Sequence, residues 1–114
     1  MPWNLDSDRP IFLQIVERLE SDIVSGKYVP GEKLPAVREL AVEAAVNPNT
    51  MQKACAELER SGLVYSQRTS GRFVTEDKKC IDQMRKELAK KTAEEFLQKM
   101  NELGIDRDEA MKFL

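Results

Sequence analysis

Histidine is absent from this chain of 114 residues, and cysteine occurs only twice, as Cys55 and Cys80. Without histidine the chain lacks the commonest general base and every catalytic triad that depends on it. Two cysteines do not make a disulfide framework, and without histidine they do not make a conventional zinc site. We therefore expect no enzymatic activity, no metal and no cofactor.

Long apolar runs are also missing, because no stretch of the sequence approaches the length of a membrane span. Residues 1–6 lack the basic and apolar regions of a signal peptide. These absences predict a cytoplasmic protein with no membrane partner. Apolar residues make up 41% of the chain and charged residues 33%, which suits one small folded domain, alone or with an appended element.

An excess of positive charge is the third absence, since the net charge is −2 and the pI about 5.3. This balance argues mildly against nucleic acid as a partner. Local charge matters more than the total, because charges beyond a Debye length of about 8–10 Å are screened from a phosphate. Residues 60–75 carry Arg60, Arg68 and Arg72 and no acidic residue. The sequence therefore predicts a modest nonspecific affinity for DNA.

What is present is a series of helical patterns. Residues 8–25 place apolar side chains three to four positions apart, which predicts an amphipathic helix. Residues 34–45 predict a second helix with a weakly capped start, because Ala36 offers no side-chain oxygen. Asn47 is a good N-cap and Pro48 suits the first helical position, so a third helix is predicted to begin there.

The third helix has two different faces. Its inward face is apolar, and its outward face is short, polar and free of acidic residues until Glu57. A helix that enters the major groove needs donors and acceptors near its N-terminus. The predicted DNA contacts at this helix are Asn47, Asn49, Thr50, Gln52 and Lys53. The alternative interpretation is an ordinary solvated helix face.

A hairpin is predicted from residues 64–66 and 72–74, which flank the polar tip Thr69-Ser70-Gly71. Arg68 and Arg72 bracket this tip and could reach a phosphate or the minor groove, although Arg72 could equally be an ordinary surface arginine. The predicted contacts in this wing are Arg68, Ser70, Gly71 and Arg72. The predicted fold is mainly α with a small β-wing, namely a winged helix–turn–helix domain over residues 1–75.

The C-terminal part, residues 76–114, is predicted to be a two-helix dimerisation element. Residues 78–103 contain no proline or glycine and predict a helix about 39 Å long. Asp106 and Glu109 predict a capping box for a short last helix. The long helix carries an apolar stripe that a second copy of the chain could cover. Its residues are Ile81, Met84, Leu88, Phe96, Leu97, Met100 and Leu103.

Other interpretations of these residues stay open. The long helix could fold back on its own domain instead of pairing, and a pair could be parallel, antiparallel or splayed. Cys55 is expected in the core, whereas Cys80 could form a disulfide between subunits. Trp3 and Phe12 could line a cleft between subunits, but core packing is the preferred interpretation for both.

These motifs resemble the GntR family of bacterial winged helix–turn–helix regulators, and most closely its short-tailed YtrA-like group. The resemblance covers residues 10–75, with several motifs in the right order and at the right separations. They are Pro10-Ile11-Phe12-x-Gln14-Ile15, Ile23-x-x-Gly26-x-x-x-Pro30-Gly31-x-x-Leu34-Pro35, Arg38-x-Leu40-Ala41, Val46-Asn47-Pro48-Asn49-Thr50, Leu58-x-x-x-Gly62-Leu63 and Gly71-x-Phe73-Val74.

The resemblance implies DNA contacts by Arg38, by the start of the third helix at Asn49, Thr50 and Lys53, and by the wing at Gly71. The chain also departs from the family pattern. Ala36 replaces the usual serine, Thr69 and Arg72 stand where glycine and threonine are common, and Pro48 stands where many relatives outside this group carry a DNA-contacting arginine.

The function implied is a homodimeric, sequence-specific repressor on a pseudo-palindromic operator of double-stranded DNA. The alternative is a winged-helix protein-interaction module that does not read DNA sequence. A small-molecule effector is possible, but the sequence identifies neither the effector nor the operator nor the regulated genes.

Overall fold

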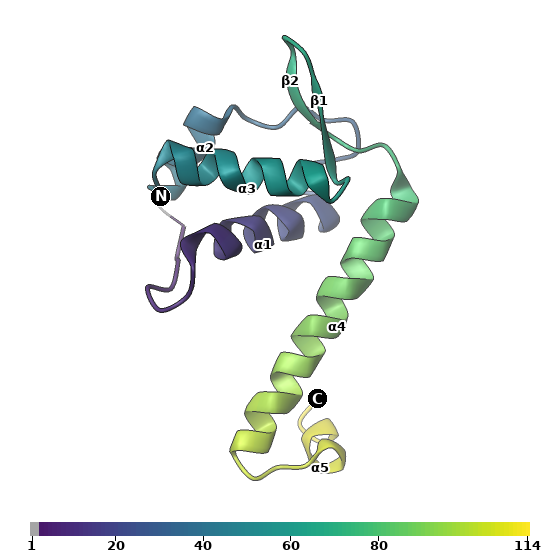
Figure 1. Cartoon of the computed structure of the whole chain (residues 1–114). Coiled ribbons are helices and arrows are strands. Elements are labelled where there is room, and N and C mark those ends of the chain that lie inside the picture. The colour runs from purple at the N-terminus through teal and green to yellow at the C-terminus, as the bar shows by residue number, and fades with distance from the viewer. Residues whose placement is uncertain (1–2) are drawn as a thin grey trace.

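The computed structural model describes residues 3–114, which form five helices and one two-stranded sheet. In chain order the elements are α1 (Ile11–Val24), α2 (Val37–Ala44), α3 (Pro48–Arg60), β1 (Val64–Gln67), β2 (Gly71–Val74), α4 (Lys78–Glu102) and α5 (Arg107–Met111). Helices α1 to α3 and the hairpin make one body, and α4 runs away from it and carries α5 near its far end (Figure 1). The predicted fold class, mainly helical with a small β-wing, is confirmed.

The core lies where α3 packs against both α1 and α2. Helix α1 contributes Ile15, Leu19 and Ile23, which recur every four residues and therefore share one face. Helix α3 contributes Met51 and Leu58, which are fully buried. Burying each of these side chains contributes roughly 1.5–3 kcal/mol, so this contact fixes the position of α3 in the body.

Helix α2 begins later than the sequence predicted. Leu34 and Ala36 lie outside it, because the chain before α2 runs beside β2 and pairs with it. The Leu34 N–H donates to the Arg72 carbonyl at 2.9 Å, and the Val74 N–H donates to the Glu32 carbonyl at 2.8 Å. The segment before α2 thus ties the hairpin to the helix–turn–helix.

The turn between α2 and α3 contains a left-handed residue. Ala45 has a φ of 60°, and its N–H donates to the Val42 carbonyl at 3.2 Å. Asn47 then caps α3, as predicted, by accepting the Asn49 N–H on its Oδ1 at 2.7 Å. Pro48 occupies the first helical position, where a missing N–H leaves no bond unmade.

Strands β1 and β2 pair in antiparallel register, with Val64 opposite Val74 and Ser66 opposite Arg72. Val64 and Val74 are buried at the base of the hairpin, which anchors the wing to the core. Gly71, at the first position of β2, has a φ of 111° that an L side chain rarely adopts. The predicted hairpin is present and each strand is slightly longer than predicted.

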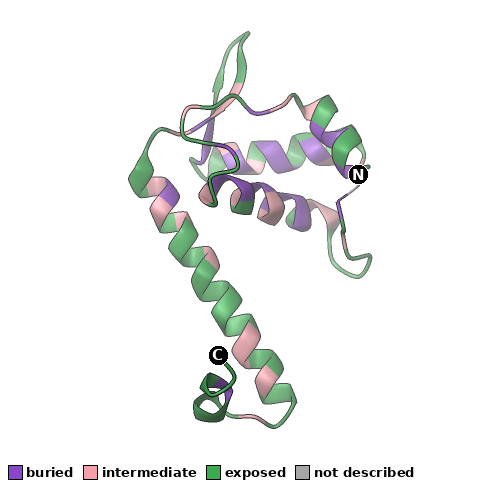
Figure 2. Cartoon of the chain, turned by 180° about the vertical axis from the view of Figure 1, so that it is seen from behind, coloured by how far each residue is buried: buried purple, intermediate pink, exposed green. Residues whose placement is uncertain are grey.

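Helix α4 is buried only near its start. Figure 2 shows a buried patch on α4 close to the hairpin and a mostly exposed helix beyond it. Ile81 belongs to the core cluster, and Met84 packs against that cluster. Farther along, most of the helix is exposed, and α5 folds back against its end with Ala110 buried. None of the helices within residues 3–114 has the length and apolar character needed to span a bilayer.

Trp3 is packed into the core. The residue is 7% exposed, and the Arg18 guanidinium carbon lies 4.7 Å from the centre of one of its rings. Phe12 is half-buried and packs against the same core. Core packing, the preferred interpretation for both aromatic residues, is confirmed.

Candidate nucleic-acid interface

The outward face of α3 presents polar side chains to solvent. Asn49, Gln52 and Lys53 are exposed, and Thr50 is half-buried beside the turn. The opposite side of the same helix is buried in the core, so the helix cannot rotate to hide its polar face. This face can donate and accept hydrogen bonds along a groove of DNA.

Two of the predicted contacts on α3 already have partners inside the chain. The Oδ1 of Asn47 is engaged as the N-cap of α3, which leaves its amide NH2 group as the donor. The Nζ of Lys53 lies 4.9 Å from the centre of the Phe12 ring, a cation–π contact between α3 and α1. That contact holds the ammonium at the α1 edge of the polar face.

Arg38 lies in the first turn of α2 and is exposed, and it forms no ion pair with any residue between 3 and 114. The start of α2 has no side-chain cap, because Ala36 stands at the N-cap position. The first N–H groups of α2 are therefore open to an outside acceptor such as a phosphate oxygen. Arg38 and these N–H groups come from the same turn and can act together.

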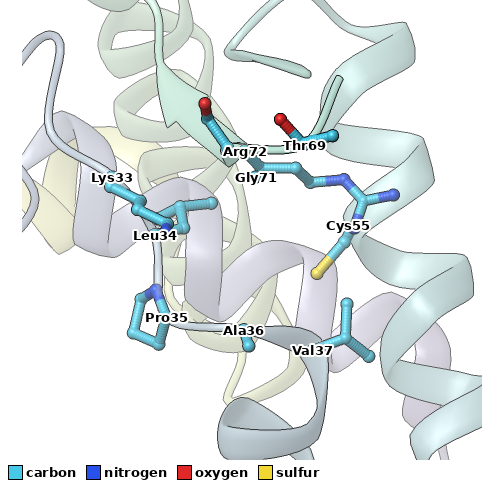
Figure 3. A pocket seen from close by; sticks show the side chains of 10 residues that line it. Lys33, Leu34, Pro35, Ala36, Val37, Cys55, Thr69, Gly71 and Arg72 are labelled. Carbon is cyan, nitrogen blue, oxygen red and sulfur yellow. The ribbon is translucent and has the colours of Figure 1, made fainter. Parts of the chain in front are cut away.

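A pocket of about 330 Å³ separates the start of α2 from the wing. Figure 3 shows Thr69, Gly71 and Arg72 of the wing facing Pro35 and Ala36 across it. Lys33 also lines it, although the sequence had not singled this residue out. A Cβ placed on Gly71 would lie 3.0 Å from the Lys33 Cε, so the lysine stem and the wing are already in close approach.

The wing tip is open to solvent. Arg68, Ser70 and Gly71 are exposed, and the Ser70 N–H closes the turn by donating to the Gln67 carbonyl at 2.8 Å. In Figure 1 the wing and α2 both lie on the side of α3 away from α1. The exposed cations Arg38 and Arg68 are therefore carried by the two elements that flank α3 on that side.

Arg72 differs from the other wing residues, because its side chain is only 20% exposed. Its Nε donates to the Glu59 Oε1 of α3 at 3.2 Å, and the Ser66 hydroxyl donates to the same oxygen at 2.8 Å. These two hydrogen bonds hold the pKa of Glu59 below its ordinary value. Glu59 could not be identified as a functional residue from the sequence, since its hydrogen-bond partners lie in another element.

The local positive charge is smaller than the sequence predicted. Arg60 pairs with Glu57 on α3, and Arg72 pairs with Glu59, so Arg68 is the one arginine of residues 60–75 without a carboxylate partner among the described residues. The charge count over residues 60–75 missed these ion pairs, because Glu57 and Glu59 both precede residue 60.

The cysteines lie in different surroundings. Burial raises the pKa of the Cys55 thiol, with the charge of Arg72 acting in the opposite direction, so Cys55 is an inert core residue as predicted. Cys80 is half-buried, with its Sγ 3.8 Å from the Gly62 carbonyl. Within residues 3–114, no cluster of three or more aspartate, glutamate, cysteine or histidine side chains could hold a metal ion.

The predicted dimerisation stripe differs in exposure along its length. Ile81 is buried in the core of its own domain, because the first turns of α4 lie against that core, and half-buried Met84 packs beside it. The rest of the stripe remains half-buried or exposed along α4, namely Leu88, Phe96, Leu97, Met100 and Leu103. Beyond it, α5 is followed by exposed Phe113 and Leu114.

Comparison with known proteins agrees with this arrangement. The model of a family described as bacterial regulatory proteins, gntR family, matches residues 12–74. The HTH-type transcriptional repressor YtrA of Bacillus subtilis is 42% identical over 73 residues, which are 64% of this chain and 56% of the relative.

Two solved structures are informative. A GntR family transcriptional regulator from Listeria monocytogenes has a TM-score of 0.86 and 41% identity, covering 96% of both chains. The DNA-binding domain of AraR, solved in complex with operator ORR3, has a TM-score of 0.57 and 33% identity, covering 66% of this chain and 90% of that one. The first likeness includes the C-terminal helices, and the second spans two thirds of this chain.

Proposed function

This chain belongs to the GntR family of bacterial regulatory proteins, which are DNA-binding transcription factors and not enzymes, and from that premise we propose that it is a repressor that binds a pseudo-palindromic operator as a homodimer. The observation that carries the proposal is the exposed polar face of α3, held between the core and the flanking cations Arg38 and Arg68. A regulator of this kind acts at the chromosome, which places the chain in the cytoplasm.

In the proposed complex, α3 enters the major groove. Asn49, Gln52 and Lys53 face the base edges, since they are the exposed side chains near its N-terminus. Thr50 and the amide NH2 of Asn47 lie at the start of the same helix and complete the contact. Base contacts of this kind supply the sequence preference.

Helix α2 and the wing, which both lie on the side of α3 away from α1 (Figure 1), contact the backbone. Arg38 and the uncapped N–H groups of α2 bind one phosphate strand, and the wing tip, through Arg68, Ser70 and Gly71, follows the minor groove. Lys33 adds a cation between them. These contacts position α3 in the groove.

The C-terminal helices supply the dimer. Helix α4 has 25 residues and leaves Leu88, Phe96, Leu97, Met100 and Leu103 without full cover in one chain. An apolar stripe of this length on an isolated helix is stabilised when a two-fold copy buries it. Residues 76–114 are thus a dimerisation element, and residues 1–75 are the DNA-reading domain.

Repression follows from occupancy of the operator, and YtrA, one of the relatives, is named a repressor. Two recognition helices related by a two-fold axis predict half-sites in inverted orientation, about one helical turn or roughly 34 Å apart. If the dimer neutralises about 6–10 phosphates, the affinity falls by some 10³–10⁵ between 50 and 200 mM salt.

Selection of bound duplexes from a random pool, followed by sedimentation of the complex, tests this proposal. We expect an enriched inverted repeat and two chains on each duplex. Enrichment of no sequence, with a second protein co-purifying from the cell, would instead support the protein-interaction module. An effector that releases the DNA stays a prediction that titration of the selected complex with candidate metabolites can test.

A further inference from the structure

Glu59, near the C-terminal end of α3, connects the recognition helix to both strands of the wing. Its Oε1 accepts hydrogen bonds from the Ser66 hydroxyl in β1 at 2.8 Å and from the Arg72 Nε in β2 at 3.2 Å. Ser66 and Arg72 are register partners, so they stand side by side on one face of the hairpin. A single carboxylate therefore bridges the two strands and fixes that face against α3.

Arg72 is held in this arrangement by its surroundings as well as by the carboxylate. Its side chain is 20% exposed and lines the same pocket as Cys55. In Figure 3 the Arg72 side chain extends toward Cys55. Arg68, four residues earlier at the tip, is exposed and has no carboxylate partner in the described chain. The wing thus carries one free cation and one that is engaged.

We propose that Glu59 and Arg72 form a clamp that sets the angle between the wing and α3, and that Arg72 is a positioning residue for operator binding and not a phosphate contact. This proposal rests on the proposed function, since it concerns how the operator-binding elements are held. It replaces the expectation that Arg72 reaches the DNA itself.

The exchange of partners explains why Arg72 stays on the protein. If its guanidinium moved to a phosphate, it would exchange one anionic partner for another, so the net gain in binding free energy would be small. It would also leave the Glu59 carboxylate unpaired beside the DNA, where like charges repel. Arg68 and Lys33 incur no such loss, because neither is paired with a carboxylate in the part of the chain described.

A double-mutant cycle on operator affinity separates the two roles. If Glu59 and Arg72 form the clamp, Glu59→Gln and Arg72→Gln each lower the operator affinity by about three- to tenfold. The double variant then loses no more affinity than either single variant. The slope of log affinity against log salt stays the same in Arg72→Gln, because no phosphate contact is lost. The matched control is Arg68→Gln at the wing tip, which lowers that slope by about one per subunit.

The opposite results would overturn the clamp. If Arg72 binds phosphate, Glu59→Gln removes an anion near the DNA and frees the arginine, so it raises the affinity. Arg72→Gln would then reduce the salt slope as Arg68→Gln does. Circular dichroism checks that each variant is folded, and Arg72→Lys, which keeps the charge but not the Nε donor, replaces Arg72→Gln if that variant does not fold.

Trypsin cleavage after Arg68, followed by mass spectrometry, tests the clamp without DNA. A wing that is no longer fastened to α3 exposes its tip more often, so Glu59→Gln and Arg72→Gln both speed this cleavage and the double variant cleaves no faster. Unchanged cleavage in both single variants contradicts the clamp even if the operator is bound. Failure of the wild type to prefer any duplex, with cleavage changed as expected, would contradict the proposed function alone.

Discussion

Lys91 of α4 donates a hydrogen bond from its Nζ to the Oε2 of Glu17 in α1 at 2.8 Å, across 74 positions of sequence. The other carboxylate oxygen of Glu17 accepts a bond from Arg9 Nη2, also at 2.8 Å. Glu17 therefore joins the loop before α1, α1 itself and α4. Because α4 carries the proposed dimer contact, this carboxylate helps to set the angle at which each DNA-reading domain leaves the dimer.

Stability should depend on the charge of Glu17. Partial burial opposes ionisation, but the hydrogen bonds from Lys91 and Arg9 outweigh it and lower the pKa of Glu17. A carboxyl whose pKa is lower in the folded state than in the unfolded state stabilises the folded state at pH values above the unfolded pKa of about 4.3. This stabilisation is lost as the pH falls through the folded pKa. Glu17→Gln should lower the free energy of unfolding at pH 7 by up to about 1 kcal/mol, with the difference vanishing in acid.

Glu20, on the same helix, is the matched control for Glu17. Its pKa is raised, chiefly because burial disfavours the charged carboxyl and secondly because Glu17 repels it. Glu20→Gln should therefore raise the unfolding free energy at pH 7, and this gain should also disappear in acid, where the wild-type side chain is protonated. Urea unfolding from pH 3 to 7 measures both differences, and two variants that shift stability in the same direction would contradict this account.

Ala45 in the helix–turn–helix is strained, because it holds a φ of 60° with a Cβ. Ala45→Gly should raise the unfolding free energy by about 1 kcal/mol, since left-handed backbone costs an L residue roughly 1–2 kcal/mol and glycine almost nothing. Thermal unfolding measures the change. Operator affinity serves as the control and should stay the same, since Ala45 is not among the proposed contacts. A less stable glycine variant would show that the turn is not strained.

Arg38 should contribute to operator affinity and not to the stability of the fold, because it is exposed and forms no ion pair within residues 3–114. Arg38→Ala should reduce operator binding by about 1–3 kcal/mol, measured by fluorescence anisotropy. Val42→Ala provides the control on the same helix, since Val42 is 78% exposed and should leave the affinity unchanged. A folded Arg38→Ala protein with full affinity would remove Arg38 from the interface.

Leu103, the residue that follows α4, ends the stripe and is 73% exposed in a single chain. Placing a charge there costs a lone chain little, but in a dimer it would bury that charge. Leu103→Glu should therefore shift sedimentation toward the monomer and weaken operator binding. Val29→Glu, at a position that is 52% exposed and outside the stripe, should do neither. A Leu103→Glu protein that sediments with the wild type would place the dimer contact elsewhere.

The helices and the wing could be predicted from the sequence because their signals are local. Asn47 and Pro48 mark the start of α3, and Gly71 stands at the turn into β2. The late start of α2 could not be predicted, because the segment before it pairs with β2 through a bridge between Lys33 and Phe73. These two residues lie far apart in the sequence. Tertiary pairing decided that boundary over local preference.

The candidate site was predictable as a set of positions but not as a set of available groups. The exposed face of α3 follows from helical spacing, so Asn49, Gln52 and Lys53 could be named in advance. The engagement of Arg72 by Glu59 depends on how the hairpin lies on α3, which no spacing reveals. The burial of Ile81 could not be predicted for the same reason, since its apolar side chain packs against other elements of its own domain.

The most direct test of DNA reading is fluorescence-anisotropy binding to the duplex immediately upstream of the protein's own gene, compared with a scrambled duplex, at roughly 0.15 M salt. A self-regulating repressor should bind its own promoter at least about a hundredfold more tightly than the scrambled sequence. Equal and weak binding to both, together with failure to select any duplex from a random pool, would contradict sequence-specific recognition by α3.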